Sequence, residues 1–225
     1  MDINLPAAKA DMLHRQLEDR GIHDPRVLAA MAKVPRERFL AERQRGEAYA
    51  DRAVPIDCGQ TISQPYIVGL MTQALRLSGS ETVLEVGTGS GYQAAVLAEL
   101  AREVISVERH PALSAQAAAR LADLGYSNVS LVVGDGTLGW AARAPYDRII
   151  VAAMAAEVPP PLFSQLAEGG ILVIPIGDRD CQILQAVGKV HGAPQVTELS
   201  ACRFVPLVGA EGWSEDGLSH GRPDA

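Results

Sequence analysis

A run of glycines directly after an acidic residue is the feature of this sequence best suited to bind a ligand. The segment Val83–Tyr92 reads Val-Leu-Glu-Val-Gly-Thr-Gly-Ser-Gly-Tyr, so an apolar stretch leads into a glycine-rich turn. Glycines let the backbone turn tightly and approach a ligand closely, and a helix that follows the turn offers free N–H groups. We therefore expect ligand contacts at Glu85, Gly87, Thr88, Gly89 and Gly91.

The spacing of these glycines argues against a nicotinamide cofactor. The dinucleotide fingerprint is Gly-x-Gly-x-x-Gly, whereas the turn here follows Gly-x-Gly-x-Gly. Glu85, just before the turn, also suits a ligand with a positive amino group better than one with phosphates. The turn therefore favours a cofactor of a different kind.

Two further acidic residues follow apolar stretches farther along the chain. Glu108, next to Arg109, ends the second stretch, where a carboxylate can accept both hydroxyls of a ribose. Asp135 and Gly136 follow the third stretch, where the carboxylate can receive an adenine amino group. Ligands in open parallel sheets bind beyond the carboxyl ends of the strands. The alternatives are a solvated charge for Glu108 and an ordinary Asp-Gly turn for Asp135.

Alternating apolar runs and helical patterns predict the elements that position these residues. A strand-helix alternation implies right-handed crossovers and a parallel sheet. Strands are expected at Thr82–Val86, Glu103–Glu108, Val129–Val133, Asp147–Ala152 and Gly170–Pro175, and helices near Gln93–Leu100, Leu113–Leu124 and Pro160–Leu166. The predicted fold is thus α/β.

The flanking regions differ from this core. Two late strands, near Cys181–Val190 and Thr197–Pro206, have only the turn Gly192-Ala193-Pro194 between them, so they should pair antiparallel. The N-terminal part shows helical spacing, with Asp24-Pro25 as a helix start and a further helix from about Pro65. We expect an N-terminal helical extension over residues 1–78, the sheet over 79–213 and a disordered tail over 214–225.

Composition narrows the functional class. The 225 residues are 48% hydrophobic but only 4% aromatic, and the net charge is −7. An acidic chain lacks the basic face that nucleic-acid binding requires. No secretory signal or membrane span is visible, so we expect a cytoplasmic monomer. Cys58, Cys181 and Cys202 are expected to be reduced and structural, and the histidines lack metal-ligand spacing.

The glycine turn, Glu108 and Asp135 stand at three successive strand ends, and together they resemble class I S-adenosylmethionine methyltransferases. The resemblance implies a Rossmann-like, seven-stranded, mostly parallel sheet with a late antiparallel pair. It also implies S-adenosyl-L-methionine as cofactor and S-adenosyl-L-homocysteine as product.

Three motifs resemble the protein-L-isoaspartate O-methyltransferase family. They are Ala30–Phe39 (Ala-Met-Ala-Lys-Val-Pro-Arg-Glu-Arg-Phe), Gly59–Val68 (Gly-Gln-Thr-Ile-Ser-Gln-Pro-Tyr-Ile-Val) and Arg203–Gly209 with Gly212-Trp213. The resemblance spans about Met12 to Trp213 and implies methylation of the free α-carboxylate of L-isoaspartyl residues in damaged proteins. The ester then closes to a succinimide, which starts repair. A carboxylate is ionised at pH 7, so no general base is expected.

This resemblance also assigns roles around the acceptor. Ser63 matches the family's active-site serine, and its hydroxyl can donate to the acceptor carboxylate, although it can also serve as a helix cap. Gln60, Thr61 and Ile62 would surround the methionine end of the cofactor, with Thr61 alternatively a turn residue. The matching substrate-side strand is Val205, Pro206 and Leu207, whose backbone could pair with a peptide or simply belong to the core.

The sequence departs from the family in two places. Ala156 stands where proline is usual, and Asp57-Cys58 stands where a glycine and a histidine or tyrosine are common. Asp57 would weaken acceptor binding if its carboxylate pointed inward. These departures leave open a methyltransferase for another carboxylate acceptor, and a binding protein without turnover is the third hypothesis.

Overall fold

A seven-stranded sheet forms the centre of the molecule in a computed structural model, which describes residues 4–214. The strand order is β5-β4-β3-β6-β7-β8-β9, with parallel pairing from β5 to β7 and antiparallel pairing of β7 with β8 and of β8 with β9. The strands are β3 (Thr82–Val86), β4 (Glu103–Glu108), β5 (Val129–Val133), β6 (Tyr146–Val151), β7 (Leu166–Gly177), β8 (Gln182–Val190) and β9 (Ala193–Cys202). The predicted fold class is confirmed.

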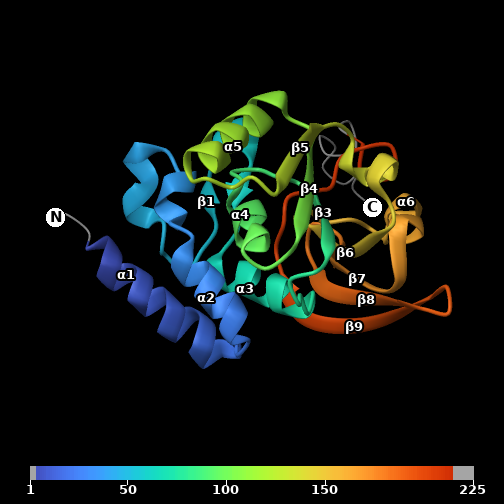
Figure 1. The fold of residues 1–225 in the computed structure, drawn as a ribbon, viewed down its shortest axis with the longest axis horizontal. Helices are drawn as coiled ribbons and strands as arrows, with labels where there is room; N and C mark the ends of the chain where they lie inside the picture. Colours follow the sequence, from blue (N-terminus) through green and yellow to red (C-terminus); the bar gives the residue numbers. More distant parts are fainter. Residues whose placement is uncertain (1–3, 215–225) are drawn as a thin grey trace, which may run out of the picture.

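Helices cover both faces of this sheet (Figure 1). Val83 and its neighbour Val104 belong to the cluster shared with α3 (Pro65–Ala74) and α4 (Tyr92–Ala98). Leu84 and Ile105 point the other way, into the cluster that contains Leu162 of α6 (Pro160–Gln165). Because side chains alternate along a strand, both faces must be apolar, which explains the continuous apolar runs in the sequence. Helix α5 (Pro111–Asp123) connects β4 to β5.

The N-terminal extension packs on the α3/α4 face. It contains α1 (Leu5–Asp11), a π-helical segment (Met12–Leu17), α2 (Pro25–Lys33) and 3-10 turns at Glu18–Arg20, Arg36–Phe39 and Glu42–Glu47. The predicted start of α2 is confirmed, because Asp24 accepts a hydrogen bond from the Arg26 N–H and Pro25 occupies the first turn. Its apolar side chains join the same cluster as α4, so the division at residue 79 stays a prediction.

The last strand lies four residues earlier than the sequence predicts. A two-residue turn at His191 and Gly192, with φ of 52° and 75°, connects β8 to β9. Positive φ at both positions matches the twist of a tight hairpin, so pairing resumes at Ala193. Pro194 is accommodated because β9 is an edge strand, where no neighbour needs its missing N–H. Prediction of the strand at Thr197–Pro206 was therefore wrong at both ends.

Two other differences concern the segments near the chain's ends. The stretch read as irregular before Pro65 contains a small antiparallel ladder, β1 (Val54–Pro55) with β2 (Thr61–Ile62). The predicted tail 214–225 lies outside the described residues except for Ser214. No helix within residues 4–214 combines the length and apolar character that a bilayer span requires.

Candidate functional site

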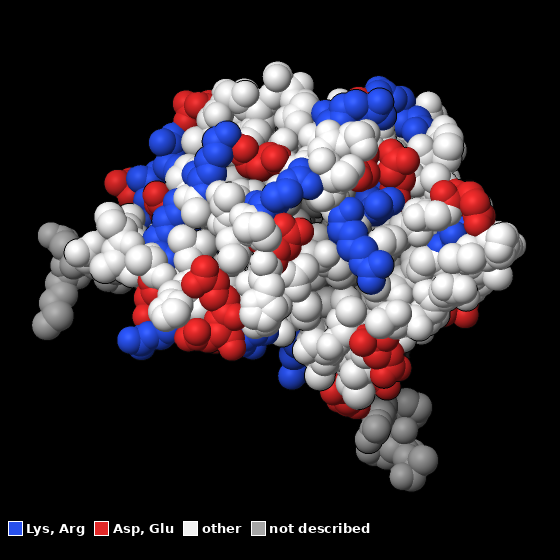
Figure 2. Space-filling model, turned by 60° about the horizontal axis from the view of Figure 1, so that its bottom comes forward, with Lys and Arg blue, Asp and Glu red and all other residues white. Residues whose placement is uncertain are grey.

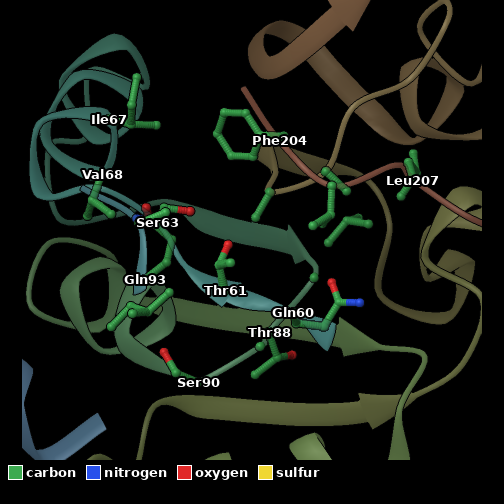
Figure 3. Close-up of a pocket in the computed structure, with 18 of the residues that line it drawn as sticks. Gln60, Thr61, Ser63, Ile67, Val68, Thr88, Ser90, Gln93, Phe204 and Leu207 are labelled. Atoms are coloured by element: carbon green, nitrogen blue, oxygen red, sulfur yellow. The ribbon is translucent and has the colours of Figure 1, made fainter. Parts of the chain in front are cut away.

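A cavity of about 640 Å³ opens at the carboxyl ends of the parallel strands. Its volume lies within the usual range for small-molecule sites, roughly 300–1,000 Å³. Its walls come from the loops after β3, β4, β5 and β6, from the segment before α3 and from the segment after β9. In Figure 3, Gln60, Thr61 and Ser63 lie along one side, and Phe204 and Leu207 lie across from them.

The glycine-rich turn forms the floor of this cavity, but its three glycines have different surroundings. Gly87 and Gly89 line the cavity with φ of 92° and 52°, a region that glycine enters without strain. A Cβ on Gly89 would meet only Ile56 Cδ1, at 3.7 Å. Gly91 instead faces α5, where a Cβ would lie 3.1 Å from the Cβ of Ala117. Gly91 therefore serves close helix packing and does not line the cavity.

Glu108 sits at the end of β4 as a buried carboxylate in the cavity wall, with only 4% of the residue exposed. Its Oε2 accepts the N–H of Gly89 at 2.8 Å, and its Oε1 accepts the N–H of His110 at 2.9 Å. A carboxylate has about four lone-pair positions, so acceptor capacity remains for ligand hydroxyls. Arg109, beside it, also lines the cavity.

Glu85 lies one layer behind the cavity. Its carboxylate accepts a hydrogen bond from Ser106 Oγ, which in turn hydrogen-bonds Thr88 Oγ1 at 2.5 Å. Thr88 reaches the cavity, whereas Glu85 does not line it and its Oε1 has no partner within the described residues. Burial raises the pKa of Glu85 to about 8, with the nearby Glu108 adding to the rise. Glu85 is therefore connected to the cavity through two hydroxyls.

Asp135 and Gly136 both follow β5, but only one of them lines the cavity. Asp135 Oδ1 accepts hydrogen bonds from the Thr137 N–H and hydroxyl, and its Oδ2 accepts the Ala210 N–H at 2.7 Å. Burial opposes ionisation, but these hydrogen bonds prevail and lower the pKa of Asp135. Asp135 does not line the cavity, and Gly136 does, packed so closely that a Cβ would lie 2.5 Å from Val86 Cγ1.

The segment Gln60–Ser63 forms the wall between the glycine-rich turn and α3, and all four residues line the cavity. The cap of α3 is Gln64, with Pro65 in the first turn and no side-chain cap bond. The alternative role of Ser63 as a helix cap is therefore wrong, because Ser63 lies one residue too early to reach the N–H groups of the first turn. Its hydroxyl makes no hydrogen bond within the described part of the chain, and its carbonyl accepts one from Arg36.

Val205, Pro206 and Leu207 line the opposite wall, beyond the end of β9. The Val205 carbonyl accepts the Met154 N–H at 2.8 Å, and the Leu207 N–H donates to the Met154 carbonyl at 2.7 Å. The expected strand is thus an isolated parallel bridge at Pro206. Alternation along an extended chain turns the Pro206 carbonyl away from Met154.

The two departures from the family pattern lie differently with respect to the cavity. The Asp57 carboxylate accepts a hydrogen bond from Gln116 Nε2 at 2.9 Å, on α5, and does not line the cavity. Cys58 lines the cavity and is exposed, with a left-handed φ of 58°. Ala156 is exposed outside the cavity. The negative charge of Asp57 is therefore directed to α5 and not into the cavity.

Several lining residues were not anticipated from the sequence. His110 follows Glu108 at the start of α5, so its place at a strand end was an available signal. Tyr66 falls within the Gly59–Val68 motif, which was an available signal. Arg20 had none, because its guanidinium, 3.7 Å from the Tyr66 ring centroid, belongs to a segment far away in the chain. All three cysteines are free, but Cys58 and Cys181 are exposed, so only half-buried Cys202 fits a structural role.

Comparisons with known proteins agree with this arrangement. A sequence model described as protein-L-isoaspartate(D-aspartate) O-methyltransferase matches residues 7–212. The chain is 52% identical over 206 residues to a protein-L-isoaspartate O-methyltransferase of Koribacter versatilis, covering 92% of this chain and 93% of that protein. It is 54% identical over 211 residues to protein-L-isoaspartate O-methyltransferase 1 of Syntrophobacter fumaroxidans, covering 94% and 99%.

Solved structures show the same likeness. A protein-L-isoaspartate O-methyltransferase structure superposes with a TM-score of 0.80 at 30% identity, covering 91% of this chain and 67% of that one. A Plasmodium falciparum structure assigned to the same enzyme was determined with S-adenosyl-L-homocysteine and superposes with a TM-score of 0.77 at 27% identity. Coverage there is 89% of this chain and 97% of the other.

Proposed function

The chain belongs to the protein-L-isoaspartate O-methyltransferase family, and from this premise we propose that it methylates the free α-carboxylate of L-isoaspartyl residues in damaged proteins and peptides. One observation carries the proposal. A single cavity joins the strand-end residues Gly89 and Glu108 to the acceptor-side residues Ser63 and Pro206. A methyl donor and an acceptor carboxylate can therefore meet within it.

The residues on the sheet side fit S-adenosylmethionine. Glu108 offers a buried carboxylate with free acceptor positions for ribose hydroxyls, and the open space above Gly89 leaves room for the ligand's close approach. The Thr88 hydroxyl, which reaches the cavity, is linked through Ser106 to Oε2 of the buried Glu85, and these polar groups offer acceptors to a ligand with an amino group. When bound, the cofactor supplies a methyl group on a cationic sulfur.

The other residues expected to bind the cofactor divide into those that would border it and those that would support it from behind the cavity wall. Gln60, Thr61 and Ile62 would enclose the methionine end, and Arg109 and Gly136 would border the nucleoside. Gly91 would support the turn through α5 rather than touch the ligand. Asp135 would act on the adenine side only through the loop that it anchors, unless its carboxylate exchanges the Ala210 N–H for the ligand.

Positioning accounts for the chemistry on the acceptor side. The Ser63 hydroxyl is available to donate to the acceptor carboxylate, and the Pro206 carbonyl faces away from Met154, its bridge partner. The acceptor is ionised at neutral pH, so the chain need not remove a proton. Alignment of reacting groups alone contributes on the order of 7–11 kcal/mol at best. The methyl ester then closes to a succinimide with loss of methanol, and the ring reopens partly to normal aspartate.

The surface supports a protein acceptor rather than a nucleic acid. In Figure 2, basic and acidic side chains are interspersed over most of the face in view, and the basic side chains gather only in a small group at its upper right. A net charge of −7 would repel phosphate backbones. We propose that the chain acts as a monomer in the cytoplasm, where its three free thiols would remain reduced.

The deciding test compares two matched peptides, one with L-isoaspartate and one with normal aspartate at the same position. Labelled S-adenosylmethionine should transfer its methyl to the isoaspartyl peptide alone, with later release of methanol. Equal transfer to both peptides would point to a broader carboxylate specificity. No transfer to either, by protein that still binds S-adenosylhomocysteine, would overturn the proposal.

A further inference from the structure

Arg36 belongs to the Ala30–Phe39 motif, which has no assigned role in the reaction described above. The residue is fully buried, and its side chain reaches three separate parts of the molecule. Nε donates to the Ala48 carbonyl at 2.6 Å, and Nη2 donates to the Ser63 carbonyl at 2.6 Å. The guanidinium carbon lies 4.7 Å from the ring centroid of Tyr92, the first residue of α4.

Burying the Arg36 guanidinium costs free energy, so its retention in the core calls for an explanation. Both acceptors of Arg36 are main-chain carbonyls, no ion pair joins it to a carboxylate within residues 4–214, and Nη1 has no hydrogen-bond partner there. Burying a cation without a counter-charge opposes folding. Burial lowers the pKa of Arg36 to about 10, so the group remains charged at neutral pH. A merely structural bond to two carbonyls does not require a charge at this place.

The bond to Ser63 explains what the charge does. A peptide plane is rigid, so holding the Ser63 carbonyl fixes the plane between Ser63 and Gln64 and restrains the main-chain atoms from which the serine side chain projects. Pro65 follows at once and restricts the backbone of Gln64. The same guanidinium stacks on Tyr92, directly after the glycine-rich turn. Arg36 thus connects the acceptor serine to the helix that starts at the cofactor side.

We propose that Arg36 is a positioning residue, which holds the main chain of Ser63 so that its hydroxyl meets the acceptor carboxylate. The inference rests on the proposed function of Ser63 and extends it to the N-terminal motif. Arg36 itself does not line the cavity, so it acts through Ser63 and not on the acceptor.

The test compares Arg36→Lys with a matched control. Lysine keeps the charge, but its single nitrogen lacks the planar fork with which arginine reaches two separated carbonyls while lying over a ring. The control is Arg148→Lys, because Arg148 also donates to two carbonyls, those of Leu75 and Asp147, but lies in β6 away from the cavity. Kinetics with the isoaspartyl peptide, the dissociation constant of S-adenosylhomocysteine and hydrogen exchange of residues 60–64 are measured for each.

Arg36→Lys should lower kcat/KM for the peptide by about tenfold or more, while the S-adenosylhomocysteine dissociation constant changes far less. The double variant Arg36→Lys/Ser63→Ala should be no slower than Ser63→Ala, because both changes remove the same interaction, that of the Ser63 hydroxyl with the acceptor. Exchange over residues 60–64 should rise only in Arg36→Lys. Losses that multiply in the double variant, or an equal loss in Arg148→Lys, would overturn the inference.

The outcomes separate this inference from the proposed function. A wild-type protein that leaves the isoaspartyl peptide unmethylated refutes the function. The exchange measurement then still decides the role of Arg36, since unchanged exchange over residues 60–64 in Arg36→Lys would show that the guanidinium does not hold this segment.

Discussion

The N–H of Gly89 donates a hydrogen bond to Oε2 of Glu108 at 2.8 Å, so the last residue of β4 holds the turn that follows β3. The second carboxylate oxygen accepts the N–H of His110 at 2.9 Å. Glu108 is therefore oriented by the protein itself. A side chain held in this way loses little freedom when a ligand binds, which favours affinity.

Glu108→Gln should weaken cofactor binding. The amide has one oxygen in place of two, so it cannot accept from Gly89, His110 and ribose hydroxyls together. Hydrogen bonds to charged groups contribute about 1.5–3 kcal/mol, which predicts a roughly 10- to 100-fold rise in the dissociation constant of S-adenosylhomocysteine. Titration calorimetry measures it. An unchanged constant in the folded variant would remove Glu108 from the cofactor site.

Glu85 should make stability depend on pH. Burial raises the pKa of its carboxyl from an ordinary 4.5 to about 8 in the folded protein. Between these values the folded chain binds one proton more than the unfolded chain. The free energy of unfolding must then fall as pH rises through this window, by up to about 1.4 kcal/mol per pH unit. Denaturant unfolding across the window should show a flatter dependence for Glu85→Gln, and parallel curves would contradict this account.

Two glycines of the site should respond differently to substitution, because a side chain at Gly136 meets the core whereas one at Gly89 meets open space. In Gly136→Ala the new Cβ would lie 2.5 Å from Val86 Cγ1, so overpacking should lower the free energy of unfolding by about 1–3 kcal/mol. Gly89→Val should block the cofactor, because its branched side chain would project from the cavity floor, and at a φ of 52° the β-branched residue should also strain the backbone and lower the free energy of unfolding. Urea unfolding and S-adenosylhomocysteine titration distinguish the two effects. Normal affinity in folded Gly89→Val would refute the placement of the cofactor.

Ser63→Ala should reduce turnover more than cofactor binding. Loss of one hydrogen bond to a charged acceptor predicts a fall in kcat/KM for the isoaspartyl peptide of about tenfold or more. The S-adenosylhomocysteine dissociation constant should stay near that of the wild type, since the serine hydroxyl is assigned to the acceptor. A variant that loses cofactor affinity alone would contradict this assignment.

The three thiols should react with iodoacetamide at different rates. Cys58 and Cys181 are exposed, whereas burial raises the pKa of half-buried Cys202 to about 11. Because the thiolate is the nucleophile, Cys202 should label slowest at mildly alkaline pH. S-adenosylhomocysteine should protect Cys58, which lines the cavity, but not Cys181. Mass spectrometry of labelled peptides follows each thiol, and equal protection of Cys58 and Cys181 would speak against a bound ligand at this site.

The sequence by itself determines the local elements and the order in which they occur. The predicted bounds of β3, β4 and β5 agree with the structure to the residue, because each is a short apolar run between turn signals, whether buried on both faces like β3 and β4 or half-exposed at the sheet edge like β5. The same reasoning places Glu108 at a strand end and begins α2 at Pro25. These features depend on neighbours along the chain, which a sequence displays directly.

Only the tertiary structure decides which strand-end residues face the cavity. Glu85 lies behind two hydroxyls, Gly91 packs on α5, and Asp135 is engaged by the Ala210 N–H. The early start of β9 depends likewise on its place at the sheet edge, and the buried contact of Arg36 with Ser63 joins segments 27 residues apart. Each of these outcomes depends on packing between segments far apart in the chain. Hydrophobic periodicity and motif spacing do not reveal such contacts.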